Sequence, residues 1–207
     1  MPVLHVLGGA NGAGKTTWYQ LGLKQQNISP DLPFINLDMI VSQELGDYTS
    51  ENLAKAEGIA RDRMRKLLED KSDFMIESNL SKSSDYDWIE RMRKNGYDTV
   101  LFFLGTKNVE INKIRVSGRV LEGGHDVADP VIEQRYRMGL SYLKSKVLDF
   151  TVATLIDVSE SEPQKMAELK LGSVSFKHPN CLPWVQSSLD LAERLAEKKR
   201  TAAEKRE

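Results

Sequence analysis

Short apolar runs alternate along the chain with longer stretches in which apolar side chains recur at every third or fourth position. Apolar runs bounded by turn residues predict buried strands, whereas the longer spacing predicts amphipathic helices. The predicted strands are Val3–Leu7, Phe34–Leu37, Asp73–Ile76, Thr99–Leu104 and Val152–Ile156. Their alternation with helices indicates βαβ units, so we expect an α/β fold with an open, mainly parallel sheet of about five strands and helices on both faces.

The predicted helices are separated by residues that stop helices, such as Asn95-Gly96 before a buried strand. They are expected at Gly14–Gln25, Ser50–Asp70, Ser84–Asn95, Asn108–Leu121, Pro130–Lys146 and from Pro183 onward. The segment Asp190–Glu207 mixes charges of both signs, which is typical of a solvated helix end, with a partner-binding tail as the alternative. We therefore expect one domain over residues 1–180 and a charged helical tail over 181–207.

Length and charge narrow the range of functions. A chain of 207 residues is expected to form one compact domain. Its 29 basic and 30 acidic residues give a net charge of −1, which argues against binding nucleic acid through a general basic surface. The longest apolar run, Val100–Leu104, is too short to span a membrane, and the N-terminus lacks the basic segment of a secretion signal. With Cys181 as the single cysteine, these features indicate a cytoplasmic protein.

A glycine-rich segment follows the first predicted strand and opens the first predicted helix. It satisfies the pattern G-x-x-x-x-G-K-[ST], whose glycines let the backbone curl so that N–H groups point at phosphate oxygens. Lys15 is expected to reach the β- and γ-phosphates of a nucleoside triphosphate, and the Thr16 hydroxyl to ligate Mg²⁺. The predicted nucleotide-binding residues of this P-loop are Gly9, Ala10, Asn11, Gly12, Ala13, Gly14, Lys15, Thr16 and Thr17.

Asp38 comes directly after the second predicted strand. Because ligands of open α/β sheets bind at the carboxyl ends of the strands, this carboxylate is expected beside the phosphate site. There it can accept a proton from an attacking hydroxyl, as phosphoryl transfer requires. The alternative is a structural role as the N-cap of the following helix.

Glu77 follows the third predicted strand in the same way. It can hold Mg²⁺ through water or orient a substrate hydroxyl, and the neighbouring Ser78 and Asn79 can hydrogen-bond a polar ligand. Helix capping explains the serines of this segment equally well. The serines in question are Ser81, Ser83 and Ser84.

Arginines gather after the fourth predicted strand. Arg115 and Arg119 are four residues apart and share one face of a helix, and Gly123-Gly124 separates them from a second helix that carries Arg135. This pattern predicts a helical lid around residues 107–147 that brings guanidinium groups over the transferring phosphoryl group. In the alternative, the segment is a surface hairpin whose arginines pair with Glu122, Asp129 or Glu133.

Four motifs together resemble one family. They are the P-loop, N-x-D after the second strand, E-S-N-L-S after the third, and R-V-x-x-R-V-x-x-G-G-H-D-V followed by R-Y. The combination, from Val3 to Ser159, is similar to the zeta-toxin-like P-loop kinases, specifically the compact bacterial branch described as predicted ABC-type ATPases. The resemblance implies a P-loop NTPase fold and transfer of phosphate from ATP or GTP, with Mg²⁺, to UDP-N-acetylglucosamine or a related UDP-amino-sugar. It also implies a toxin restrained by a separately encoded antitoxin.

The resemblance assigns roles to individual positions. It implies that Lys15 acts on the phosphates and that Asp38 is the general base. It makes Arg119 and Arg135 the catalytic arginines of the lid, with Arg115 as a third contact to the nucleotide. The substrate-binding residues that it implies are Asp38, Glu77, Asn79 and His125.

Two other functions remain open at this point. The protein can instead be a kinase for another acceptor, such as a nucleoside, an antibiotic or a nucleic-acid end. It can also be a nucleotide-binding switch that hydrolyses ATP slowly and transfers no phosphate, because the P-loop serves motors and switches as well as kinases.

Overall fold

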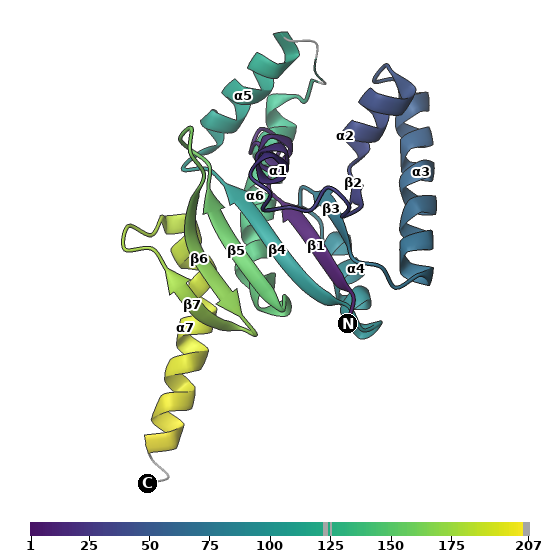
Figure 1. The fold of residues 1–207 in the computed structure, drawn as a ribbon. Helices are drawn as coiled ribbons and strands as arrows, with labels where there is room; N and C mark the ends of the chain where they lie inside the picture. The colour runs from purple at the N-terminus through teal and green to yellow at the C-terminus, as the bar shows by residue number, and fades with distance from the viewer. Residues whose placement is uncertain (122–123, 125, 205–207) are drawn as a thin grey trace.

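The computed structural model describes residues 1–121, 124 and 126–204, and its centre is a seven-stranded sheet in the order β2-β3-β1-β4-β5-β6-β7 (Figure 1). The strands are β1 (Val3–Gly8), β2 (Phe34–Ile35), β3 (Phe74–Ser78), β4 (Asp98–Gly105), β5 (Val152–Asp157), β6 (Gln164–Lys170) and β7 (Ser173–Lys177). Strands β1 to β5 pair in parallel, and β6 and β7 are antiparallel to their neighbours. The mainly parallel α/β sheet that the sequence predicts is confirmed.

The prediction of five strands is wrong at one edge of the sheet, where the β6–β7 hairpin adds two more. The β6 sequence, Q-K-M-A-E-L-K, consists of residues that favour helices, and only Met166, Ala167 and Leu169 are buried. Pairing with β5 overrides that local preference. The hairpin turn has Leu171 and Gly172 with φ of 49° and 74°, the left-handed backbone that two-residue hairpin turns require.

Helices connect the parallel strands and cover the sheet. The predicted strand Phe34–Leu37 ends at Ile35, because Asn36 caps a short helix that already includes Leu37. The helices are α1 (Lys15–Lys24), α2 (Leu37–Ile40), the π-helical η1 (Val41–Leu45), α3 (Ser50–Glu69), α4 (Ser83–Lys94), α5 (Val109–Leu121), α6 (Asp129–Lys146), the 3₁₀ turn η2 (Val147–Asp149) and α7 (Pro183–Glu204).

The core lies on both faces of the sheet. Leu4 and Val6 of β1 point to one face and Leu7 to the other, as the two-residue period of a strand dictates. The first face packs with residues of α3, α4, α6 and α7, including Leu143, and the second packs with Tyr19 of α1. Each fully buried large side chain contributes about 1.5–3 kcal/mol, so this two-sided burial holds the parallel strands in place.

The carboxyl ends of the parallel strands meet at the edge of the sheet that carries α1, α2 and α5 (Figure 1). The C-terminal end of α7 projects away from the opposite edge. Several strand-to-helix connections therefore lie at the carboxyl ends of the strands, where an open α/β sheet binds its ligands.

None of the helices in the described part of the chain combines the length and apolar character that a membrane span requires.

Candidate functional site

A cavity of about 560 Å³ opens at the carboxyl edge of the sheet. Its lining includes Asn11–Thr17 from the P-loop and the start of α1, together with four residues that are distant in sequence. These four are Asp38, Glu77, Arg115 and Arg119. The structure thus brings most of the predicted site residues into one space, from β3, α1, α2 and α5.

The P-loop curls tightly before α1 begins at Lys15. Gly12 and Gly14 both have φ of 74°, a left-handed conformation that L side chains rarely adopt. Gly14 is the N-cap of α1, and in the described structure no side chain caps this helix. The first backbone N–H groups of α1 therefore keep their capacity to bind an anion, helped by the positive end of the helix dipole.

The Gly12→Ala variant is expected to damage the P-loop more than an ordinary glycine substitution. A Cβ at Gly12 would overlap the backbone carbonyl of Asn112, whereas Gly46, with φ of 89°, has no neighbouring atom within 4 Å of such a Cβ. We expect Gly46→Ala to cost about 1–3 kcal/mol of unfolding free energy from backbone strain alone, because φ of 89° with ψ of −89° is sparsely populated by L residues. We expect Gly12→Ala to cost about 1–3 kcal/mol more because the backbone must move.

Denaturant unfolding of the two variants, with ATP binding measured beside it, checks this expectation. Gly12→Ala is expected to weaken ATP binding about tenfold or more, a loss of about 1.4 kcal/mol, and Gly46→Ala to leave it unchanged. Equal losses of stability and of ATP affinity in the two variants would show that the approach of α5 to Gly12 does not matter.

Lys15 is folded back onto its own loop. Its Nζ donates hydrogen bonds to the carbonyl oxygens of Gly9 at 2.7 Å and Ala10 at 3.2 Å and to Oδ1 of Asn79 at 3.2 Å. Glu77 Oε1 lies 3.5 Å from the same nitrogen, and the Lys15 side chain is only 6% exposed. A buried ammonium needs such partners. The structure therefore places Asn79 and Glu77 beside the P-loop lysine, as the prediction of a shared site requires.

Asn36 holds the other side of Glu77. Its Nδ2 donates to Glu77 Oε2, and its Oδ1 accepts a hydrogen bond from the backbone N–H of Met39 at 2.9 Å. Asn36 is therefore the N-cap of α2, and the alternative that Asp38 is this cap is wrong. Asn36 is the first residue of the N-x-D motif, but no site role was predicted for it from the sequence. The signal that could have found it is an Asn directly after a strand and before a helical segment.

Asp38 lies in the first turn of α2 and lines the cavity. Its Oδ2 is 4.0 Å from Nη1 of Arg119, and the two side chains are 42% and 39% exposed. The Tyr48 hydroxyl donates to the backbone carbonyl of Asp38 at 3.0 Å. Burial raises the pKa of this hydroxyl, and the negative charge of Asp38 raises it further. The Asp38 carboxylate itself stays open to the cavity, where it can accept a proton.

The other two arginines contact backbone and amide oxygens. Nη2 of Arg115 donates to the carbonyl oxygen of Ser159 at 3.3 Å. Nη1 of Arg135, on α6, donates to Oδ1 of Asn11 in the P-loop at 2.8 Å. Arg135 thus contacts the phosphate loop directly, whereas Arg115 lines the same cavity as the loop.

The alternative pairing of these arginines with Glu133 is wrong. Glu133 instead forms an ion pair with Lys113 at 2.5 Å, which joins α6 to α5. Hydrogen bonds from Lys113 to Glu133 and to a second glutamate raise the pKa of this lysine. Glu122 and His125 lie outside the described residues, so their predicted roles stay predictions.

The serines after β3 do not cap the next helix. The N-cap of α4 is Lys82, whose backbone N–H donates to the Asp85 carboxylate at 3.4 Å. The hydroxyl of Ser78 accepts a hydrogen bond from the backbone N–H of Leu80 at 3.0 Å, and Leu80 has φ of 50°. Ser78 therefore stabilises the turn that carries Asn79 toward Lys15.

The lining of the cavity also includes apolar side chains that were not predicted from the sequence, and we call them the apolar wall. They are Trp18 and Leu21 of α1 and Val158 and Pro163 from the segment between β5 and β6. No motif marks these residues, and the segment leads into the hairpin that the sequence did not predict. The wall offers apolar surface next to the phosphate loop, which suits a flat ring such as a nucleobase.

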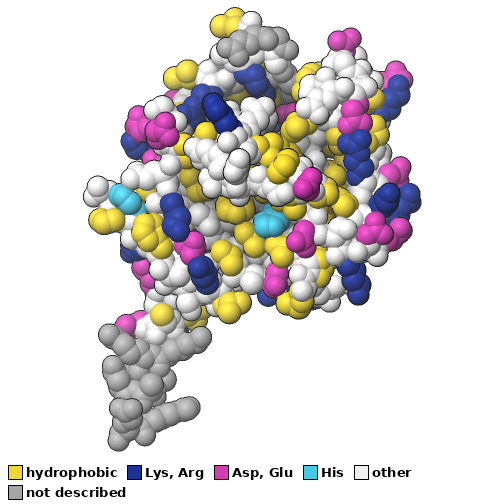
Figure 2. All heavy atoms as spheres, viewed as in Figure 1, with side chains coloured by type: hydrophobic (Ala, Val, Ile, Leu, Met, Phe, Trp, Pro, Cys, Tyr) yellow, Lys and Arg dark blue, Asp and Glu magenta, His cyan; other side chains and the backbone are white. Residues whose placement is uncertain are grey.

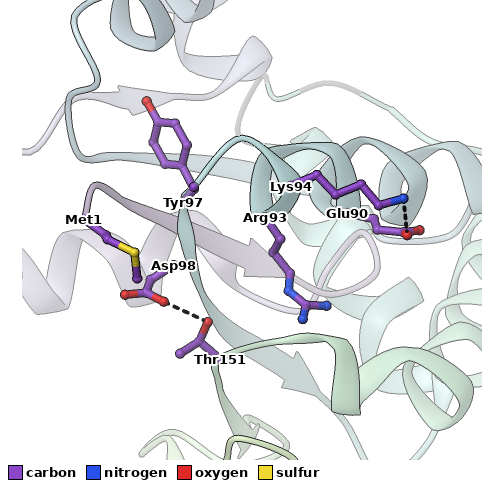
Figure 3. Close-up of a pocket in the computed structure, with 8 residues that line it drawn as sticks. Met1, Glu90, Arg93, Lys94, Tyr97, Asp98 and Thr151 are labelled. Carbon is purple, nitrogen blue, oxygen red and sulfur yellow. Dashed lines mark hydrogen bonds and ion pairs between the residues drawn. The ribbon is translucent and has the colours of Figure 1, made fainter.

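A second cavity, of about 380 Å³, lies at the opposite edge of the sheet (Figure 3). Among its charged side chains, Lys94 forms an ion pair with Glu90 at 2.7 Å, and Asp98 accepts a hydrogen bond from the Thr151 hydroxyl at 3.3 Å. Its lining contains none of the predicted site residues. The candidate site is therefore the cavity at the carboxyl edge.

The order of the strands, the P-loop and the helices define an α/β P-loop NTPase fold. No protein-family model matches the chain. An uncharacterized protein of Haemophilus influenzae is 29% identical over 129 residues, which are 62% of this chain and 88% of the relative.

Two groups of solved structures have the same fold. A chain of the AvrRxo1-ORF1:AvrRxo1-ORF2 complex with sulphate ions superposes with a TM-score of 0.69 and 18% identity, covering 91% of this chain. A chain of the PezAT chromosomal toxin-antitoxin system of Streptococcus pneumoniae superposes with a TM-score of 0.62 and 16% identity, covering 96% of this chain and 87% of that one. This chain spans 64% of the matched chain from the AvrRxo1 complex. At these identities the comparisons show the fold.

Proposed function

We propose that this protein is a zeta-toxin-like P-loop kinase that transfers the γ-phosphate of ATP or GTP to a hydroxyl of a small molecule. The observation that carries the proposal is the cavity that joins the P-loop, Asp38 and Arg119 in one space. A P-loop alone serves many functions, but a carboxylate and a guanidinium facing it are the groups that phosphoryl transfer needs. The structural similarity to the AvrRxo1 complex, which has also been crystallised with ATP, and to PezAT supports it.

The phosphates of the nucleotide are bound by the P-loop backbone and by Lys15. When they enter, the ammonium exchanges its hydrogen bonds with the Gly9 and Ala10 carbonyls for phosphate oxygens. Glu77 and Asn79 stay beside it and limit where it can move. We place the nucleobase of ATP or GTP against the apolar side chains of Trp18 and Val158.

The residues of the cavity fit Mg²⁺. Thr16, Asp38 and Glu77 line it and offer hydroxyl and carboxylate oxygens, the ligands that Mg²⁺ prefers. Within the described ranges, no group of three or more His, Cys, Asp or Glu side chains could hold a metal. We therefore assign the Thr16 hydroxyl as the side-chain group that would hold Mg²⁺ beside the phosphates. When bound, the ion neutralises charge on the β- and γ-phosphates.

Asp38 acts as the general base and the arginines act on the phosphoryl group. The carboxylate accepts the proton of the attacking hydroxyl, which raises the nucleophilicity of that oxygen. Arg119, 4.0 Å from Asp38, stabilises the charge that spreads over the transferring group. Arg115 and Arg135 complete the lid around residues 107–147, with Arg135 moving from Asn11 to the phosphates.

The acceptor that we propose is a UDP-amino-sugar such as UDP-N-acetylglucosamine. Asp38, Glu77, Asn79 and His125 are assigned to this substrate, in keeping with the family resemblance. Toxicity and restraint by a separately encoded antitoxin belong to the same proposal, supported by the similarity to the PezAT toxin-antitoxin system. A cytoplasmic location, where ATP and nucleotide sugars are available, follows from this substrate.

A small acceptor is favoured over a nucleic-acid end. Figure 2 shows one face of the molecule, in the same view as Figure 1. Over the described part of that face, lysine and arginine side chains are interspersed with aspartate and glutamate. Binding a nucleic-acid backbone instead calls for a continuous basic stripe. The balanced total charge of −1 agrees with a site built for one small anionic ligand.

Purified protein, Mg²⁺ and γ-labelled ATP incubated with UDP-N-acetylglucosamine test the acceptor. Transfer of label to the sugar nucleotide is the expected result. UDP-glucose, a nucleoside, an aminoglycoside and an RNA 5′-hydroxyl end serve as competing acceptors in parallel reactions. Label on one of these instead would contradict the UDP-amino-sugar as acceptor and would still support a kinase. Release of inorganic phosphate alone would support the nucleotide-binding switch.

A further inference from the structure

Asn112 is a buried polar residue that links the P-loop to α5. It is 1% exposed, and its Nδ2 donates a hydrogen bond to the backbone carbonyl of Asn11 at 2.7 Å. Its own backbone carbonyl lies against Gly12, where only a glycine leaves room for it. Side chain and backbone of one residue thus contact two consecutive residues of the phosphate loop.

The opposite end of the Asn112 amide is also held. Its Oδ1 accepts a hydrogen bond from the Thr106 hydroxyl at 2.5 Å, and Thr106 follows β4 directly. The backbone carbonyl of Thr106 accepts a further bond from the Tyr136 hydroxyl of α6 at 2.9 Å. A buried amide whose donor and acceptor are both engaged in this way has one orientation. Asn112 therefore fixes α5 relative to the sheet and the P-loop, and the Tyr136 hydroxyl joins α6 to the same strand end through Thr106.

The arginines of α5 follow Asn112 by three and seven positions, which places all three side chains on neighbouring parts of one helix face. Arg115 and Arg119 line the cavity, and Asn112 lies at the base of the same helix, against the P-loop. A rotation or shift of α5 at Asn112 would move both guanidinium groups relative to the phosphates.

We propose that Asn112 is a positioning residue that sets where Arg119 stands over the P-loop. The proposal rests on the proposed function, because it gives Arg119 a phosphoryl group to act on. Nothing about Asn112 in the sequence marks it, since an asparagine in the middle of a helix carries no motif. Its role follows from two hydrogen bonds to elements that lie far apart in the chain.

The test uses ATP hydrolysis with water as the acceptor, so that it does not depend on knowing the natural acceptor. Asn112→Leu keeps the branched outline of the side chain in a bulkier form and removes both hydrogen bonds. Thr106→Val removes the bond at Oδ1, together with the contact of the Thr106 hydroxyl with the carbonyl oxygen of Asn108, and leaves the link to Asn11. Both variants are expected to lower the midpoint of thermal unfolding. Only Asn112→Leu is expected to lower kcat about 10- to 100-fold, the effect of a misplacement of about 1 Å, with less than about a threefold change in KM for ATP.

The double variant Asn112→Leu, Arg119→Ala separates positioning from general loosening. If Asn112 acts through Arg119, introducing Asn112→Leu into the Arg119→Ala enzyme lowers kcat by less than about a further threefold. Losses of kcat that multiply in the double variant would overturn the proposal, as would an Asn112→Leu enzyme with the kcat of the wild type.

The two proposals fail differently in this experiment. ATP hydrolysis that depends on Asn112, without transfer to any acceptor, would overturn the proposed kinase function and support the positioning role of Asn112. Phosphate transfer that is unchanged in the Asn112→Leu variant would support the kinase function and overturn the positioning role. A wild type that neither hydrolyses ATP nor transfers phosphate would overturn both.

Discussion

Replacing Lys15 with methionine is expected to lower the rate of phosphoryl transfer by at least about 1000-fold, or about 4 kcal/mol of transition-state stabilisation. The ammonium is the cation of the P-loop itself, and methionine fills the same volume without the charge. The removed group also bonds Gly9, Ala10 and Asn79, so a loss of about 2 kcal/mol of unfolding free energy is expected as well. The measurement is steady-state transfer of label from γ-labelled ATP, with denaturant unfolding to show that the variant is folded.

Lys24→Met is the matched control for this experiment. Lys24 is an exposed residue in the last turn of the same helix, so the control removes the same charge from α1 at its other end. Activity and stability close to those of the wild type are expected. A folded Lys15→Met enzyme that transfers phosphate at the rate of the Lys24→Met enzyme would show that the P-loop lysine takes no part in the reaction.

Replacing Asp38 with asparagine is expected to lower kcat by about 10²- to 10⁴-fold, because the amide cannot accept the proton of the attacking hydroxyl. The substitution keeps the shape of the side chain, and Asn36 continues to cap α2. The affinity for ATP is expected to stay within about threefold of that of the wild type, because Asp38 acts on the acceptor rather than on the donor. Transfer kinetics and equilibrium binding of ATP, measured on the same preparation, separate the two effects.

Asp47→Asn is the control here. Asp47 is an exposed residue between η1 and α3, and the same chemical change at this position is expected to leave kcat unchanged. An Asp38→Asn variant with undiminished kcat would exclude Asp38 as the base. A variant that instead lost ATP affinity would show that Asp38 helps to hold the nucleotide and its Mg²⁺.

The parts of the fold that were predictable depend on local patterns. Strands β1, β3, β4 and β5 are mainly apolar runs that contribute buried residues to the core, and a P-loop has a fixed order of glycines, lysine and hydroxyl. The carboxyl ends of such strands meet at one edge, so the sequence alone could place Asp38 and Glu77 near Lys15. The cavity brings these three side chains together.

The parts that were missed depend on contacts between distant segments. The β6 strand is made of helix-favouring residues and forms because β5 offers it a hydrogen-bonding edge. Asn36 and Asn112 act through buried amides whose partners are set by the tertiary fold. The bond between Arg135 and Asn11 spans 124 positions of the chain, and no local pattern reveals such a partner.

The central claim is that this cavity transfers phosphate to a small molecule. Its most direct test is incubation of the wild type, Lys15→Met and Asp38→Asn proteins with γ-labelled ATP and a bacterial metabolite extract, followed by chromatography of the labelled products. We predict a new labelled small molecule with the wild type and none with either variant. Inorganic phosphate as the sole labelled product of the wild type, or the same labelled molecule from all three proteins, would contradict the account.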